Sequence, residues 1–217
     1  MASARIPRPD LPDRMTWEQL EQLPEDIARQ IELWEGRVVW LRRGPAEHQA
    51  FTFALTSALK RAARSGMIDH PERCWRVDFE TNVFFGPTGK SDFMTPDFLV
   101  YRCLDAPYQD IRAADTLLAG EVLSPSNSQT DMEAKKARYA GAGIPWYWEV
   151  TLERERSAIA VIRAYVLETT HGTLPEGVRP LRRANYLVAG EWTPKDSASI
   201  DIDFPFPIRI PWADLEF

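Results

Sequence analysis

The chain has 217 residues, a formal net charge of −6 at pH 7 and a pI near 5.2. Its 44% hydrophobic and 27% charged residues exclude a wholly disordered or fibrous protein. No run of about 18 apolar residues occurs, so we expect no membrane span. The acidic balance excludes a broadly basic surface that coats nucleic acid, although it leaves room for a local basic cleft.

Residues 1–14 combine prolines with charges and lack an apolar segment, which predicts a flexible lead-in and no targeting signal. We therefore expect a cytoplasmic protein. Cys74 and Cys103 are far apart in sequence and belong to no Cys/His cluster, so a zinc site is not indicated. We expect both to be small buried residues in a reducing compartment, without a disulfide.

The first ordered segment begins at Thr16, which is suited to cap a short helix together with Gln19 in a capping box. That helix should end near Pro24. Apolar residues over 31–40 predict two strands, which the turn Glu35-Gly36 separates.

Pro45 should begin a long amphipathic helix over residues 46–65, and Gly66 should end it. Alternating apolar and polar residues over 75–85 then predict one half-buried strand. A turn over 86–89 follows that strand.

Two short apolar strands are predicted over 98–101 and 117–123, and a second helix over 129–142. Further strands are expected over 146–150 and 159–167. This order of strands and helices indicates an α/β fold.

From residue 171 onward the chain is rich in proline, with strand-like pieces at 184–188 and 200–204. We predict a domain over residues 15–170, and an irregular or small β appendage of the same domain over 171–217.

Two carboxylates are the most informative residues. Glu121 lies within the apolar strand 117–123, where an ionised side chain costs several kcal/mol unless a cation or hydrogen-bond donors compensate it. Asp97 begins the preceding strand. If the two strands are neighbours, both acids converge on one site, and Mg²⁺ takes carboxylate, carbonyl and water ligands of this kind.

A cation is available on the following helix. Asp131, Lys135 and Arg138 share one face of it, because they are three or four residues apart. Met132 and Tyr139 lie on a neighbouring face suited to packing. The short connection after Glu121 brings Lys135 near the two acids, where a lysine stabilises developing phosphate charge or orients water.

These motifs resemble the Uma-two family of restriction endonucleases, within the PD-(D/E)XK nuclease superfamily, over roughly residues 15–165. The resemblance is carried by Pro96-Asp97, the run Glu121-Val122-Leu123-Ser124-Pro125-Ser126, Asp131, Lys135, Tyr139 and residues 143–148, with Glu32-Leu33, Glu35-Gly36 and His48 upstream.

The resemblance implies a restriction-endonuclease-like core, a mixed β-sheet flanked by helices. It implies Asp97 and Glu121 as Mg²⁺ ligands, with the Val122 carbonyl as a third and Mn²⁺ as a substitute ion. Leu123 stands where the superfamily pattern has lysine, and Lys135 on the next helix takes that place. His48 becomes a candidate that orients substrate or water.

Each candidate also has a purely structural interpretation. Asp97 is able to cap a turn, and Glu121 to form an ion pair with Lys135 or Arg138. His48 alone is more typical of packing or surface positions, and Lys135 of a solvated helix face.

Neighbouring polar residues are expected to be peripheral. We expect Lys136 at the surface and Ser124 and Ser126 at the helix entry. Glu32 and Glu35 are placed at the rim of the site, with a turn as the alternative for Glu35.

Two functions follow. The first is a Mg²⁺-dependent endonuclease that acts on DNA, which the superfamily implies, and that works as a homodimer. With a net charge of −6, its DNA contacts must be local; the candidates are Lys135, Lys136, Arg138, Arg61 and Arg64. The second is a non-catalytic binding or assembly protein that retains the fold.

Overall fold

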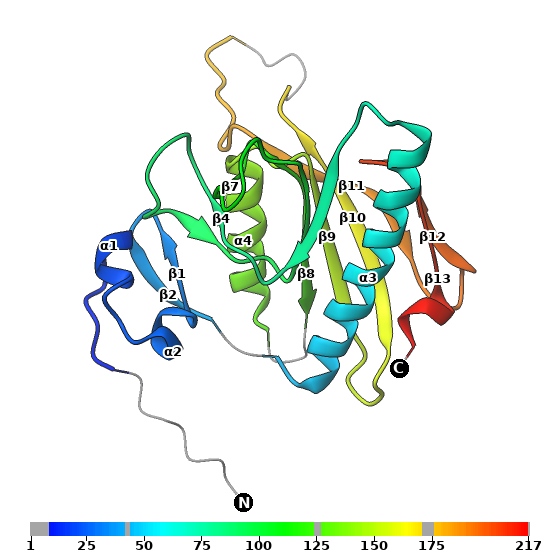
Figure 1. Cartoon of the computed structure of the whole chain (residues 1–217), viewed down its shortest axis with the longest axis horizontal. Coiled ribbons are helices and arrows are strands. Elements are labelled where there is room, and N and C mark those ends of the chain that lie inside the picture. Colours follow the sequence, from blue (N-terminus) through cyan, green and yellow to red (C-terminus); the bar gives the residue numbers. More distant parts are fainter. Residues whose placement is uncertain (1–8, 42–43, 124–126, 171–175, 217) are drawn as a thin grey trace, which may run out of the picture.

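The computed structural model describes residues 9–41, 44–123, 127–170 and 176–216 (Figure 1). Within these ranges, a six-stranded sheet forms the centre of the molecule, in the order β11-β10-β9-β8-β6-β3. Its strands are β3 (Trp75–Phe79), β6 (Phe98–Arg102), β8 (Thr116–Leu123), β9 (Trp146–Leu152), β10 (Ile159–Glu168) and β11 (Asn185–Trp192).

A smaller sheet, in the order β2-β1-β5-β4-β7, lies beside the central one together with two short helices. Its elements are α1 (Trp17–Leu20), α2 (Glu25–Ala28), β1 (Ile31–Trp34), β2 (Arg37–Trp40), β4 (Val83–Phe84), β5 (Phe93–Met94) and β7 (Ile111–Arg112). The helix, the capping box of Thr16 and Gln19, and the two strands around Glu35-Gly36 are confirmed.

The central sheet is mixed, because β8 runs parallel to β9 while its other pairings are antiparallel. The long helix α3 (Ala46–Asp69) packs on one face and α4 (Gln129–Gly141) on the other (Figure 1). The predicted mixed sheet flanked by helices is confirmed.

Alternation along β6 shows how the two faces are built. Phe98 and Val100 pack in the core beneath α3, whereas Leu99 and Tyr101 pack with Tyr139 of α4. Since successive side chains of a strand point to opposite faces, the position before Phe98 belongs to the α4 face.

The segment after residue 176 contributes to both faces of the core. Strand β11 extends the central sheet at its edge. The hairpin of β12 (Ser199–Ile202) and β13 (Ile208–Pro211), followed by the 3-10 helix η1 (Trp212–Leu215), packs against α3. Residues 171–175 lie outside the described ranges. None of the helices in those ranges combines the length and the apolar character that a membrane crossing needs.

The prediction that Gly66 ends the long helix is wrong, because α3 continues to Asp69. Gly66 instead lies buried inside the helix, where an added Cβ would stand 3.0 Å from Phe206 and 3.2 Å from Trp75. Its missing side chain lets the helix approach these rings closely, so the glycine serves packing.

The predicted strand over 75–85 is in fact two strands in different sheets. β3 ends at Phe79 and β4 begins at Val83, and between them Glu80 adopts a φ of 45°. Val83 and Phe85 continue the apolar alternation of β3 in the sequence, although all residues over 83–85 are buried, so the pattern could not reveal the change of sheet.

The expectation for the cysteines is also wrong. Cys74 and Cys103 form a disulfide, with their Cα atoms 5.3 Å apart, and neither residue is buried. They lie just outside the paired ends of β3 and β6, which brings them together across the sheet. The cysteines therefore give no support for a reducing compartment.

Gly120 of β8 faces Phe98, its partner on β6, and a Cβ at this position would overlap the Phe98 ring. We therefore expect Gly120→Ala to lower the free energy of unfolding by roughly 1–3 kcal/mol, as overpacking in a dense core does. Urea denaturation measures the change.

Gly141→Ala is the matched control, because no atom lies within 4 Å of a Cβ there and we expect no loss of stability. In a Phe98→Ala background the Gly120→Ala substitution should cost less than it does alone. Equal costs in both backgrounds would contradict the overlap.

Candidate active site at the ends of β6 and β8

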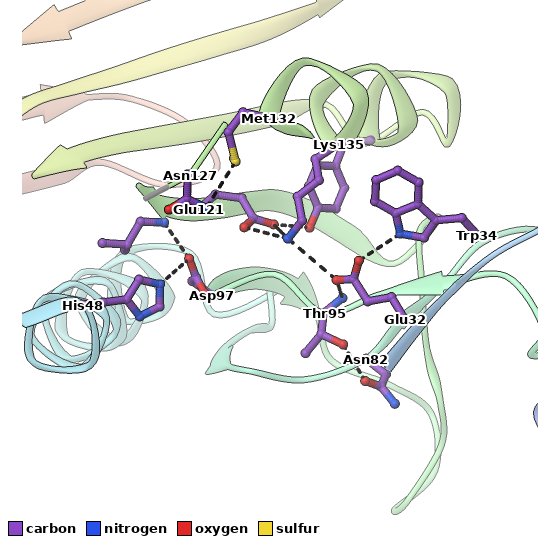
Figure 2. Close-up of polar contacts among 12 residues, drawn as sticks. Glu32, Trp34, His48, Asn82, Thr95, Asp97, Glu121, Asn127, Met132 and Lys135 are labelled. Atoms are coloured by element: carbon purple, nitrogen blue, oxygen red, sulfur yellow. Dashed lines mark hydrogen bonds and ion pairs between the residues drawn. The ribbon is translucent and has the colours of Figure 1, made fainter. Parts of the chain in front are cut away.

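Asp97 and Glu121 stand opposite each other on the α4 face of the central sheet. Phe98 of β6 pairs with Gly120 of β8, so the residue before Phe98 lies across from the residue after Gly120. Directly opposite residues of antiparallel strands project to the same face. The main-chain N–H of Val122 donates to Asp97 Oδ2 over 2.6 Å, which ties the two strand ends together (Figure 2).

His48 reaches Asp97 from the first turn of α3, which begins after Pro45. Its Nε2 lies 3.0 Å from Asp97 Oδ2. Burial opposes protonation, but the hydrogen bond and the charge of Asp97, with Glu121 and Glu80 nearby, raise the pKa of His48 above its ordinary value. Gly44 passes so close that a Cβ there would overlap the imidazole.

Glu121 is buried, with 4% of the residue exposed, and the helix α4 supplies its partners. Lys135 Nζ lies 3.0 and 2.9 Å from the two carboxylate oxygens, and the Tyr139 hydroxyl donates to Oε1 over 2.7 Å (Figure 2). Lys135 and Tyr139 are four residues apart and therefore share a helix face. The predicted approach of Lys135 to the acids is found, and Tyr139 adds a donor as well as the predicted packing.

The charges around Glu121 do not balance. Burial raises the pKa of Glu121 to about 7; Lys135 lowers it, while the negative charges of Asp97 and Glu32 raise it further. Burial opposes the charge of Lys135, but Glu121, Glu32 and Asp97 outweigh burial and raise its pKa. The lysine is therefore a permanent cation beside an excess of carboxylates.

Glu32 belongs to this cluster, although the sequence placed it at the rim. It is 0% exposed, and its Oε1 lies 3.7 Å from Lys135 Nζ. The signal in the sequence was a carboxylate between Ile31 and Leu33 of an apolar strand, the same pattern that singled out Glu121. Glu35 does occupy the turn, with a φ of 52°.

The other basic residues of α4 are engaged elsewhere. Lys136 is not at the surface: its Nζ lies 3.1 Å from Glu149 Oε2 and the side chain is 14% exposed. Arg138 pairs with Asp92 and not with Glu121. These two side chains and Lys135 are therefore engaged in ion pairs and mostly screened from solvent, and their role as DNA contacts stays a prediction.

Of the other two predicted DNA contacts, Arg61 pairs with Asp214, and Arg64 is exposed. Ser124 and Ser126, predicted at the helix entry, lie outside the described residues. Ser128 caps α4, its hydroxyl accepting from the main-chain N–H of Asp131 over 3.1 Å.

A groove of about 2000 Å³ opens onto the cluster and is lined by parts of both sheets, the start of α3, and α4. Among the described residues that line it, nine are acidic and four are basic. The described part of the chain contains no group of three or more His, Cys, Asp or Glu side chains arranged to hold a metal ion. A cation here would need main-chain and water oxygens beside Asp97 and Glu121.

Comparison with known proteins shows the family to which this chain belongs. The family model Uma2, described as "Putative restriction endonuclease", matches residues 17–179. The chain belongs to the Uma2 family. The match spans the strands and helices that carry His48, Asp97, Glu121 and Lys135, and it ends at residue 179 where the motifs indicated an end near residue 165.

A solved structure gives the same picture for the fold. It is described as the crystal structure of "a putative nuclease belonging to DUF820" from Anabaena variabilis. The alignment has a TM-score of 0.55 and 17% sequence identity, and covers 93% of this chain and 97% of that chain. No curated protein matches the chain. The family description supports a nuclease, and the solved structure shows the shared fold.

The raised pKa of Glu121 makes a prediction for stability. Between pH of about 4.5 and about 7 the folded protein holds a proton on Glu121 that the unfolded chain releases, so stability falls as pH rises through this window. Glu121→Gln keeps a neutral group there. In metal-free buffer we expect it to exceed the wild type in unfolding free energy by up to roughly 3 kcal/mol above pH 7.

Urea denaturation in EDTA at pH 4.5, 6 and 8 checks this. The difference should vanish at the lowest pH. Glu155→Gln, at an exposed position, serves as the control and should show no such trend. A wild type that is the more stable protein at pH 8 would contradict the prediction.

Proposed function

We propose that this chain is a Mg²⁺-dependent endonuclease that hydrolyses phosphodiester bonds of DNA through a PD-(D/E)XK-type site. The observation that carries the proposal is the placement of Asp97 and Glu121 on one face of two paired strand ends, with Lys135 in contact with Glu121. Membership of the Uma2 family supports the same reaction class.

The residues present fit a divalent cation. Glu32 and Glu121 flank the Lys135 ammonium, and the negative charges of Asp97 and Glu32 are part of what raises the pKa of Glu121. A cation relieves such repulsion. Mg²⁺ usually keeps several waters and uses one or two protein carboxylates, so Asp97, Glu121 and the Val122 carbonyl would suffice as its ligands.

When bound, Mg²⁺ polarises the phosphate and lowers the pKa of the attacking water. The side chains of this chain have distinct tasks around it. Asp97 and Glu121 hold the cation, and Lys135, fully charged, stabilises the negative charge that develops on the phosphate. His48 holds the Asp97 carboxylate in place through Nε2.

DNA as the substrate rests on the family description and not on the charge of the groove. Because acidic side chains dominate its lining, contacts to phosphates must come from exposed arginines such as Arg37 and Arg76, from bound cations or from a partner. A homodimer stays a prediction, which sedimentation at tens of micromolar protein decides.

Plasmid cleavage tests the proposal. In Mg²⁺ or Mn²⁺ the wild type should nick or linearise plasmid, and Asp97→Ala, Glu121→Ala and Lys135→Ala should each lower the rate by roughly 100-fold or more, since each removes a metal ligand or the stabilising charge. Glu149→Gln, which removes the buried acid of the adjacent strand β9, is the matched control. Equal rates for the wild type and Glu121→Ala would attribute any cleavage to contamination.

One observation favours the alternative of a non-catalytic binding or assembly protein. Both oxygens of Glu121 accept hydrogen bonds from Lys135, and one also accepts from Tyr139, so protein donors already compensate the carboxylate.

Calorimetric titration with Mn²⁺ decides between the two functions. The nuclease should bind Mn²⁺, and Asp97→Asn should weaken that binding roughly tenfold or more, because a charged ligand is lost. An absence of heat at millimolar Mn²⁺ would favour the non-catalytic protein.

A further inference from the structure

Glu32 is a buried carboxylate that enters the site from the smaller sheet. It lies on β1, flanked by the buried residues Ile31 and Leu33, and it has no exposed surface. A carboxylate in such a place needs hydrogen-bond donors or a cation to remain charged. The structure provides both.

Two donors fix its orientation. The main-chain N–H of Thr95 donates to Oε1 over 2.8 Å, and the indole N–H of Trp34 donates to Oε2 over 2.9 Å (Figure 2). Thr95 is itself held through its hydroxyl by Asn82 and lies two residues before Asp97. The carboxylate is therefore aimed by the segment that also carries a proposed metal ligand.

The Oε1 atom of Glu32 faces Lys135 Nζ at 3.7 Å, on a side that Glu121 does not occupy (Figure 2). The ammonium thus lies between carboxylates from two different sheets. Its closer partner, Glu121, is also a proposed metal ligand. A cation that takes the Glu121 oxygens competes with Lys135 for them, which leaves Glu32 as the anion beside the lysine.

We propose that Glu32 is a positioning residue, whose carboxylate holds the Lys135 ammonium at the site when Glu121 is engaged by a metal ion. This step rests on the proposed nuclease function. Glu32 touches neither substrate nor metal in it, and acts through Lys135. The hydrogen bonds from Thr95 and Trp34 fix the orientation of the Glu32 carboxylate, so that it stays beside Lys135 and does not turn toward the cation.

A second ion pair on the same helix supplies a matched comparison. Lys136, the next residue of α4, pairs with Glu149 of β9, which is mostly buried like Glu32. Glu149 stands in register with Glu121, yet it holds Lys136 and not Lys135. Replacing Glu149 disturbs a mostly buried acid–lysine pair but leaves the contact between Glu32 and Lys135 in place.

The test uses protein labelled with ¹⁵N-lysine, because lysine NH₃⁺ protons give a signal only where an ion pair slows their exchange with water. Glu121→Gln, without metal, imitates the loss of the Glu121 charge. We expect the Lys135 signal to persist in this variant and to be lost in Glu32→Gln/Glu121→Gln. In Glu149→Gln/Glu121→Gln the Lys135 signal should remain, and Lys136 keeps its second partner, Glu133, at 3.0 Å.

Either of two results overturns the proposal: a Lys135 signal that survives in Glu32→Gln/Glu121→Gln, or one already absent from Glu121→Gln. If Glu32→Gln/Glu121→Gln does not fold, Trp34→Phe/Glu121→Gln replaces it, since this pair removes the donor that orients Glu32 and keeps the carboxylate. The Lys135 signal should then broaden, and an unchanged signal overturns the proposal.

Cleavage kinetics separate this inference from the proposed function. Glu32→Gln should lower kcat roughly tenfold, as the loss of a group behind a functional residue does, with KM and Mn²⁺ affinity unchanged. A change confined to KM overturns the positioning role. A wild type without metal-dependent cleavage overturns the nuclease proposal, and the metal-free spectra still decide whether Glu32 holds Lys135.

Discussion

The site depends on one buried ammonium group. Lys135 Nζ contacts both oxygens of Glu121 and approaches Glu32, and the three side chains have little or no exposure to solvent. Each of these charges would be costly alone in the interior, and each is tolerated because the others are present. The two β-sheets and α4 meet at this point, so the arrangement of the fold and the charge of the site are linked.

The cluster of Asp97, Glu121, Glu32 and Lys135 is not neutral. Burial is the main cause of the raised pKa of Glu121, and the negative charges of Asp97 and Glu32, which Lys135 does not fully compensate, raise it further. The divalent cation that we propose would relieve this excess of carboxylates.

The charge of the groove around the site is unfavourable for binding nucleic acid. Its acidic lining repels the phosphates of nucleic acid. The basic residues of α4 already form ion pairs with Glu121, Glu149 and Asp92. Membership of the Uma2 family supports a nuclease, whereas the charge of the groove means that the proposed DNA binding would need exposed arginines, cations or a partner. Reaction chemistry and substrate recognition therefore rest on different parts of the molecule.

Most elements around the site could be predicted from local patterns in the sequence, and so could the neighbouring positions of Asp97 and Glu121. Helix caps, strand alternation and turn glycines are local, so the predicted capping box, the apolar strands around Asp97 and Glu121, and the following helix were found where the pattern placed them. The helical spacing also directed Lys135 toward the acids, since the connection between strand and helix is short.

Which strands become neighbours across the chain could not be predicted from local patterns, and the remaining features depend on that pairing. Glu32 joins the site because the smaller sheet packs beside the central one, Lys136 is buried because β9 places Glu149 beneath it, and Cys74 meets Cys103 because β3 pairs with β6. A local pattern states which face a residue takes, but not which element will cover that face. Long-range packing sets which element covers a face, and this in turn sets burial and charge pairing.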